Sequence, residues 1–247
     1  MKRGLYLPPF GTLGDVNLLV DLAGAAEAAG WDGFFLWDHI RHEKPIPFAD
    51  PWIALSAIAA TTDRIRLGPL VTPLPRRRPW KVAREAVTLD HLSSGRLVLG
   101  VGLGVDHWGE YSAFGEAATT DAQRAVLLDE GIATINRLWS GEFRPPPLQQ
   151  PRIPLWGAAR FPLNPGPVRR AATLDGIMPW KPAGPFTADD VRAIRDAIGR
   201  DDPYDIAICG QPGDAAAYEA AGLTWLFEGF SEGAQLDDVR QIIAAGP

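Results

Sequence analysis

The sequence predicts an α/β protein built as a single (β/α)8 barrel, with parallel strands inside a ring of helices. Short β-rich runs recur along the chain, and each is followed by a helical pattern, which is typical of βα units and a parallel sheet. Eight such runs occur in 247 residues, and about 250 residues is the usual size of a closed barrel. No repeat or low-complexity tract divides the chain, so we expect one domain over residues 1–247.

The predicted strands are short runs rich in branched and aromatic residues, bounded by glycine, proline or aspartate. We expect them at residues 3–8, 33–39, 65–72, 96–104, 153–158, 175–180, 205–210 and 224–230. The single cysteine, Cys209, falls in the seventh run, where we expect a buried strand residue. One cysteine excludes an intrachain disulfide and a cysteine-rich zinc site.

The predicted helices follow from caps and apolar spacing. Residues 15–30 begin with a capping aspartate, place apolar side chains on one face and stop at a glycine. Residues 50–62 begin in the same way, with Pro51 at the first helical position, where a missing N–H costs nothing. The longest helix is expected over residues 120–142, ending near Gly141. Later helices are expected within residues 165–174, 187–199, 213–221 and 236–245.

The stretch GPLVTPLPRRRPWKVARE, residues 68–85, contains the third strand, the loop after it and the start of the next helix. In a barrel of this kind the C-terminal ends of the strands form the active face, so a loop stiffened by prolines at this place is expected to hold a ligand. The three arginines are expected to begin the helix as solvated residues, with Arg77 or Arg78 as candidates to reach a cofactor tail or an interface.

Composition favours a small-molecule partner. The 30 acidic residues outnumber the 24 basic ones, for a net charge of -6, and no basic stripe is present, so nucleic-acid binding is not expected. The N-terminal segment reaches prolines before it builds the apolar run of a signal peptide, and no long apolar run follows. We therefore expect a cytoplasmic protein without a membrane partner.

Residues 62–104 strongly resemble the central part of the bacterial luciferase-like flavin and deazaflavin oxidoreductases. The shared motifs are R-I-x-L-G on a strand, a proline-containing loop, R-x-P at a helix start, T-L-D-x-L-S-x-G-R at its end and L-G-x-G-x-G on the next strand. The resemblance extends over roughly residues 1–180. It implies a (β/α)8 barrel that binds a flavin-type ring at the C-terminal ends of its strands, here with a shortened insertion region after Trp180.

The resemblance also implies where the cofactor binds. A bulge with a non-proline cis peptide, expected at Leu70–Val71, would support the ring from behind. The cofactor's phosphate is expected in WGAAR, residues 156–160, at backbone N–H groups of a helix start and the Arg160 side chain. The implied cofactor-binding residues are Leu70, Val71, Thr72, Gly102, Leu103, Gly104, Ala158, Ala159 and Arg160.

Asp38 and His39, at the end of the second strand, are the candidate catalytic residues, with the His39 imidazole near the reactive edge of the ring as a donor or acid. A metal site at His39, His42 and Glu43 is the less favoured interpretation, because the H-x-H of metal-dependent barrel hydrolases is missing from the first strand. One residue of a further set is expected to face substrate. The set is Asp106, His107 and Trp108.

The Asp-His ending of the second strand resembles the branch that uses coenzyme F420, a deazaflavin, so the resemblance implies hydride transfer between this coenzyme and a small organic substrate. An FMN-dependent monooxygenase that uses reduced flavin and oxygen is the alternative, and a non-catalytic flavin-binding protein is the second alternative. The sugar-phosphate dehydrogenase branch carries a glutamate where this chain has Val105, so that reaction is disfavoured. Family members often pair through helices, and a homodimer is a further expectation.

Overall fold

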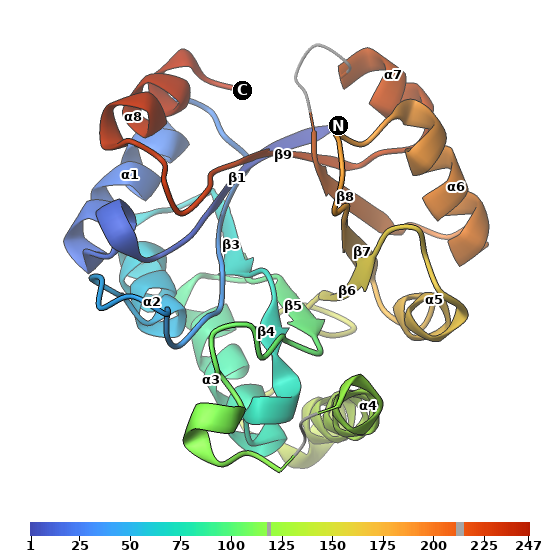
Figure 1. Cartoon of the computed structure of the whole chain (residues 1–247). Helices are drawn as coiled ribbons and strands as arrows, with labels where there is room; N and C mark the ends of the chain where they lie inside the picture. Colours follow the sequence, from blue (N-terminus) through green and yellow to red (C-terminus); the bar gives the residue numbers. More distant parts are fainter. Residues whose placement is uncertain (118–119, 211–214) are drawn as a thin grey trace.

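A parallel barrel forms the centre of the computed structural model, which describes residues 1–117, 120–210 and 215–247 (Figure 1). Its strands are β1 (Lys2–Leu7), β2 (Gly33–Leu36), β3 (Arg66–Pro69), β4 (Thr72–Pro73), β5 (Leu99–Gly102), β6 (Leu155–Arg160), β7 (Gly176–Trp180), β8 (Asp205–Cys209) and β9 (Trp225–Gly229). They are ordered β3-β2-β1-β9-β8-β7-β6-β5-β4. Because β3 and β4 are consecutive halves of the third predicted strand, the two ends of this order meet and the barrel closes. The predicted (β/α)8 class is confirmed.

The third strand is divided at its C-terminal end. Its first half pairs with β2, with Leu36 opposite Pro69, and its second half pairs with β5, with Thr72 opposite Val101. The peptide bond between the halves, Leu70–Val71, is cis, as predicted. The division therefore lets one strand bridge two neighbours that converge on the same end of the barrel.

The helices surround the strands, with α1 beside α2 and α8, and α6 beside α5 and α7 (Figure 1). They are α1 (Val16–Ala28), α2 (Pro51–Thr61), α3 (Pro79–Leu92), α4 (Asp121–Arg137), α5 (Pro165–Ala171), α6 (Ala188–Ile198), α7 (Ala215–Ala220) and α8 (Leu236–Ala245). Short helical segments are η1 (Gly11–Leu13), η2 (Leu74–Arg76), η3 (Ser112–Phe114) and η4 (Leu138–Glu142). None of the helices described is long and apolar enough to cross a bilayer.

The predicted helix starts agree with the structure at two caps. The Asp15 carboxylate accepts hydrogen bonds from the N–H groups of Asn17 and Leu18, at 2.7 and 3.2 Å, and the Asp50 carboxylate accepts one from Ile53 N–H at 3.0 Å. The third helix begins at Pro79, after the three arginines rather than with them. Residues 213–214 of the predicted helix at 213–221 lie outside the described residues, and α7 covers its centre.

Aromatic side chains fill the interior of the barrel. Phe35, Trp156, Trp225 and Phe227 come from three strands and are almost fully buried, with ring centroids 5.2 to 6.4 Å apart. A separate layer of aliphatic side chains packs between the outer faces of the strands and the helices. The aromatic layer closes the barrel below its C-terminal end, so any space for a ligand lies above it.

Candidate functional site

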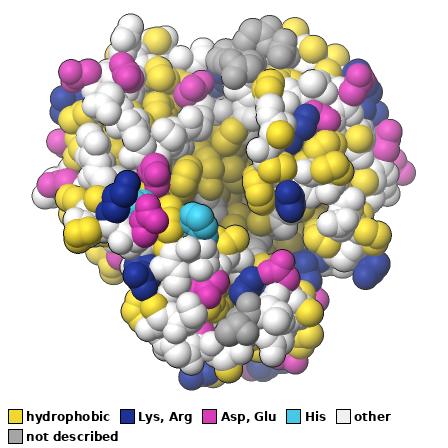
Figure 2. Space-filling view, in the orientation of Figure 1, with side chains coloured by type: hydrophobic (Ala, Val, Ile, Leu, Met, Phe, Trp, Pro, Cys, Tyr) yellow, Lys and Arg dark blue, Asp and Glu magenta, His cyan; other side chains and the backbone are white. Residues whose placement is uncertain are grey.

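A cavity of about 390 Å³ opens at the C-terminal ends of the strands. Its lining residues come from β1, β6, β7, β8, the residue after the cis bond and the loop after β7. They are Tyr6, Val71, Ala158, Met178, Pro179, Trp180, Lys181, Gly184, Phe186 and Cys209. Figure 2 shows a hollow lined by hydrophobic side chains at the centre of this face, with a histidine at its edge. The cavity therefore offers mainly apolar contacts with few polar ones, which is typical of sites for flat organic ligands.

The glycine at the end of β5 keeps this cavity open. A Cβ atom at Gly102 would lie 2.8 Å from Cγ2 of Val71 and 3.1 Å from Cβ of Ala158. Any side chain at this position would therefore push Val71 or Ala158 out of place. Gly102, Val71 and Ala158, three of the predicted cofactor-binding residues, lie together at the cavity.

Besides Lys181, which is paired with Asp190, two polar side chains belong to the same lining, Tyr6 and Cys209. Burial, and secondarily the nearby Cys209 thiol, raises the pKa of the Tyr6 hydroxyl, and burial raises the pKa of Cys209 to about 12. Both groups are therefore neutral at physiological pH. The Tyr6 hydroxyl has no hydrogen-bond partner in the described part of the chain, so it is free to donate to a ligand.

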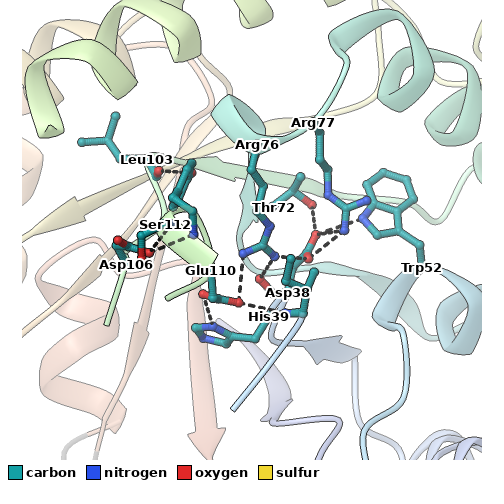
Figure 3. Close-up of polar contacts among 12 residues, drawn as sticks. Asp38, His39, Trp52, Thr72, Arg76, Arg77, Leu103, Asp106, Glu110 and Ser112 are labelled. Carbon is teal, nitrogen blue, oxygen red and sulfur yellow. Dashed lines mark hydrogen bonds and ion pairs between the residues drawn. The ribbon is translucent and has the colours of Figure 1, made fainter. Parts of the chain in front are cut away.

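His39 is held by a glutamate from the loop after β5 (Figure 3). Its Nδ1 lies 2.9 Å from Oε2 of Glu110, whose Oε1 accepts a hydrogen bond from the N–H of Ile40 at 2.8 Å. The Glu110 side chain is 1% exposed, whereas that of His39 is 22% exposed. Within the described residues His39 Nε2 makes no hydrogen bond, so it is the ring nitrogen available to a ligand.

Glu110 is kept ionised by its neighbours. Burial acts to raise its pKa, but the hydrogen bond and charge of His39, the Arg76 charge and the Ile40 N–H together hold the pKa below its usual range. Nη1 of Arg76 lies 3.0 Å from Oε1 of Glu110. As a carboxylate, Glu110 can only accept hydrogen bonds, so it fixes the His39 proton on Nδ1.

Asp38 lies on the other side of its strand, away from the cavity. Its carboxylate is 2% exposed and accepts hydrogen bonds from four side chains. The donors are Trp52 Nε1 at 3.0 Å, Thr72 Oγ1 at 2.8 Å, Arg76 Nη2 at 3.0 Å and Arg77 Nη2 at 2.8 and 3.0 Å. All the carboxylate's acceptor positions are therefore occupied by the protein. Arg76 and Arg77, expected as solvated residues, are mostly buried, because each neutralises part of this charge.

Of the three candidate substrate-facing residues, Trp108 lies beside His39. Their ring centroids are 4.9 Å apart, and His39 also contacts the ring of Trp37 at 6.0 Å. Asp106 instead accepts hydrogen bonds from the N–H groups of Tyr111 and Ser112, which hold its pKa below the usual range and shape the loop. His107 is exposed.

Four other predicted cofactor-binding residues do not line the cavity. Leu70 is buried below the cavity, and Thr72 donates to Asp38. The Leu103 carbonyl accepts the Tyr111 hydroxyl at 2.7 Å, and Gly104 has φ +66°, a conformation suited to glycine.

WGAAR does not begin a helix. Ala158, Ala159 and Arg160 lie within β6, paired with residues 178–180 of β7, and α5 begins only at Pro165. The expected helix start at this motif is thus wrong, because the strand continues two residues further than predicted, to Arg160. Ala159 faces the outer layer, whereas Arg160 is exposed, with its guanidinium 5.5 Å from the Trp180 ring centroid.

Glu110 was not among the residues predicted for the site. It stands five residues beyond Val105, in the loop after β5. Loops that follow the strands of a barrel converge at its C-terminal end. An acidic residue in this loop was therefore a candidate partner for His39. No group of three or more histidine, cysteine or acidic side chains able to hold a metal occurs in ranges 1–117, 120–210 and 215–247.

The luciferase-like monooxygenase family matches residues 1–228 of the chain. Among curated proteins, the chain is 40% identical over 129 residues to an F420-dependent glucose-6-phosphate dehydrogenase of Nakamurella multipartita, which covers 50% of this chain and 37% of that protein. It is 31% identical over 161 residues to the oxygenase component of a flavin-dependent trigonelline monooxygenase of Acinetobacter baylyi, covering 58% and 43% of the two chains. The chain thus aligns with less than half the length of these relatives.

Solved structures share the fold at low sequence identity. The coenzyme F420 dependent tetrahydromethanopterin reductase of Methanopyrus kandleri superposes with a TM-score of 0.72 at 16% identity, covering 98% of this chain and 97% of that one. An F420-dependent secondary alcohol dehydrogenase in complex with an F420-acetone adduct superposes with a TM-score of 0.76 at 14% identity, covering 99% and 97%. These likenesses extend over the whole barrel.

Proposed function

This chain belongs to the luciferase-like monooxygenase family, and from that premise we propose that it transfers hydride between coenzyme F420 and a small organic substrate. The observation that carries the proposal is the His39–Glu110 pair, which leaves one imidazole nitrogen available at the mouth of an apolar barrel. The F420-dependent relatives and neighbouring structures support the choice of coenzyme.

The residues present fit a flat aromatic ring. Gly102 carries no side chain where one would displace Val71 and Ala158, so these two residues keep their places in the apolar lining against which a planar group can pack. Arg160 is exposed near Trp180 and has no acidic partner in the part of the chain that the structure describes, so it is available to the coenzyme's phosphate. When bound, the coenzyme supplies the ring carbon that accepts or releases hydride.

In this proposal the side chains of the site have separate tasks. His39 Nε2 accepts a proton from the substrate or returns one, while Glu110 stabilises the imidazolium that forms. Tyr6 provides a neutral hydrogen-bond donor in the cavity. Asp38 holds the arginines and does not touch the reacting atoms, so it is a positioning residue and not a catalytic one.

An FMN-dependent monooxygenase is the second candidate. The relative from Acinetobacter baylyi, named as a flavin-dependent monooxygenase component, favours it. The cavity suits the ring of coenzyme F420 and that of FMN equally, because its lining is mainly apolar and its hydroxyl, that of Tyr6, can donate to either ring.

The test is a titration of the protein with coenzyme F420 and, separately, with FMN, followed by tryptophan fluorescence. Trp180 lines the cavity and Trp37 and Trp108 contact His39, so quenching will report binding there. We expect tighter binding of coenzyme F420. Turnover is then measured as oxidation or reduction of the coenzyme with alcohols, sugar phosphates and unsaturated acceptors.

The variant His39→Asn separates binding from chemistry. We expect its affinity for the coenzyme to stay within about threefold, while turnover falls about a hundredfold or more, because a general acid or base is lost. His91→Asn is the matched control, since His91 Nε2 donates a hydrogen bond to the Pro146 carbonyl at 2.8 Å, outside the barrel interior. Tighter FMN binding would support the monooxygenase, and ligand binding with unchanged turnover in His39→Asn would contradict the role given to His39.

A further inference from the structure

The arginine run after the third strand places one guanidinium between the two acidic side chains of the site (Figure 3). Nη2 of Arg76 donates to Oδ1 of Asp38 at 3.0 Å and to its backbone carbonyl at 2.8 Å, and Nη1 lies 3.0 Å from Oε1 of Glu110. The Arg76 side chain is 4% exposed. A planar guanidinium can hold two partners in a fixed geometry, which a lysine ammonium cannot do in the same way.

Four buried or mostly buried charges balance here. Asp38 and Glu110 are negative, and Arg76 and Arg77 are positive. Arg77 contacts the Asp38 carboxylate and packs near the Trp52 ring, at 5.8 Å, but has no contact with Glu110 in the described structure. Arg76 alone therefore connects the Asp38 side of the cluster with the glutamate that holds His39.

We propose that Arg76 is a positioning residue that keeps Glu110 in place as a carboxylate and thereby holds His39 in the Nδ1–H tautomer. Arg76 and the Ile40 N–H both contact Oε1 of Glu110. The other carboxylate oxygen, Oε2, is therefore left to accept a hydrogen bond from His39 Nδ1. The Nε2 lone pair then stays available to accept a proton. The expected effect of Arg76 on turnover rests on the proposed function. The expected tautomer of His39 does not.

The surroundings of His39 contain few other groups that could set its proton. Trp108 contacts His39 and also the ring of His42, at 4.5 Å, but His42 is paired with Glu232 at 3.0 Å. The charged or titratable groups of the neighbouring elements include Asp38, Arg41, His42, Arg76, Arg77, Asp106, His107, Glu110, Tyr111 and Glu232. Glu110 is the group that contacts an imidazole nitrogen of His39.

The tautomer can be measured on the protein without any ligand, by two-dimensional NMR of ¹⁵N-labelled histidine. The chain has four histidines, and His39→Asn identifies the signals of His39. In the unaltered protein we expect neutral His39 to carry its proton on Nδ1. In Arg76→Gln we expect a mixture of tautomers, because Glu110 loses the charge that fixes it.

Arg77→Gln is the matched control, since it removes the same charge from the same cluster without a contact to Glu110. It should leave the His39 tautomer unchanged. Arg76→Lys keeps the positive charge but loses the planar guanidinium that contacts both Asp38 and Glu110, so it should also give a mixture of tautomers. This variant tests the proposal if Arg76→Gln does not fold. With a substrate in hand, kcat should fall about twofold to tenfold in Arg76→Gln and KM should change little, because only the fraction of molecules with the Nδ1–H tautomer can accept a proton at Nε2.

His39 remaining entirely in the Nδ1–H form in a folded Arg76 variant would overturn the proposal, as would an equal change in Arg77→Gln. Because the tautomer is read without a ligand, such a result leaves the hydride-transfer function standing. Conversely, a protein that binds neither coenzyme would contradict that function while the tautomer measurement still decides the role of Arg76.

Discussion

At the scale of single residues, the site depends on the alternation of side chains in the segment that directly follows β2. Trp37 and His39 point toward the barrel mouth, whereas Asp38 between them points outward to Trp52 and the arginines. Adjacent residues at a strand end therefore cannot share one task in the cavity. The same alternation puts Ala158 in the cavity and its neighbour Ala159 against the helices.

Glu110→Gln tests the ionised carboxylate at this scale. The folded protein lowers the pKa of Glu110, so its contribution to stability is full above the pKa of an unfolded glutamate and disappears as pH falls through the lowered folded pKa. We expect the variant to be less stable than the unaltered protein at about pH 7, by about 1 to 3 kcal/mol, and the difference to shrink toward about pH 3. Urea unfolding at several pH values measures this difference.

A difference independent of pH would show that the lost stability comes from packing rather than from the charge of Glu110. Glu142→Gln is the control, because Glu142 pairs with Arg137 on the surface and both side chains are about half exposed. Its effect should stay within about 1 kcal/mol at every pH, as for other exposed ion pairs.

At the scale of elements, the barrel closes where β3 meets the segment leading into β5. Leu67 forms an isolated parallel bridge with Leu97, and Val98 N–H donates to the Leu67 carbonyl at 2.9 Å. The neighbouring Gly68 is in close contact with this segment: a Cβ atom there would lie 1.8 Å from the Val98 carbonyl oxygen. Since that oxygen belongs to backbone, the contact cannot be relieved by a rotamer change.

Gly68→Ala should therefore destabilise the protein severely, by about 3 kcal/mol or more, or prevent its accumulation as a folded chain. The control is Gly24→Ala within α1, where the added Cβ would meet no atom within 4 Å apart from the adjoining backbone of its own helix, and alanine favours the helix by about 1 kcal/mol. Thermal and urea unfolding of both variants give the comparison. Equal stability of the two would contradict the closure described for β3.

The order of the elements could be predicted because it depends on local patterns: caps at Asp15 and Asp50, and short apolar runs between turns. The charged cluster could not be predicted, because Arg76 and Arg77, which follow β4, meet Asp38, which follows β2, only in the folded barrel. In the sequence, a buried run of arginines looks the same as a solvated one. Glu110 reaches His39 across 71 positions of sequence. The wrongly predicted helix start at residues 156–160 has a simpler cause, since pairing with β7 extends β6 to Arg160.

At the scale of the whole molecule, two cavities are mainly apolar but lie in different surroundings. The cavity at the barrel mouth is built on the aromatic interior and lies between strand ends. The other, of about 530 Å³, is a groove between α1 and α8 on the outside of the barrel, lined among others by Leu22, Ala25 and Ile243. Volume alone would favour the groove, but none of the described residues that line the groove is a histidine or carries a hydroxyl such as that of Tyr6.

The two cavities can be distinguished by filling each one with the same substitution. Ala158→Leu places a larger side chain beside Gly102 and Val71, so a ring bound there must displace it at a cost of about 1 to 3 kcal/mol, or about tenfold to a hundredfold in Kd. Ala25→Leu fills part of the outer groove and should leave Kd unchanged, because that groove is separated from the strand ends by the helix layer. Fluorescence titration of both variants with coenzyme F420 and with FMN measures the effect. Weaker binding in Ala25→Leu with unchanged binding in Ala158→Leu would move the ligand to the outer groove. The opposite result would support a ligand at the barrel mouth, where His39 can act on a substrate while Glu110 and Arg76 hold it in place.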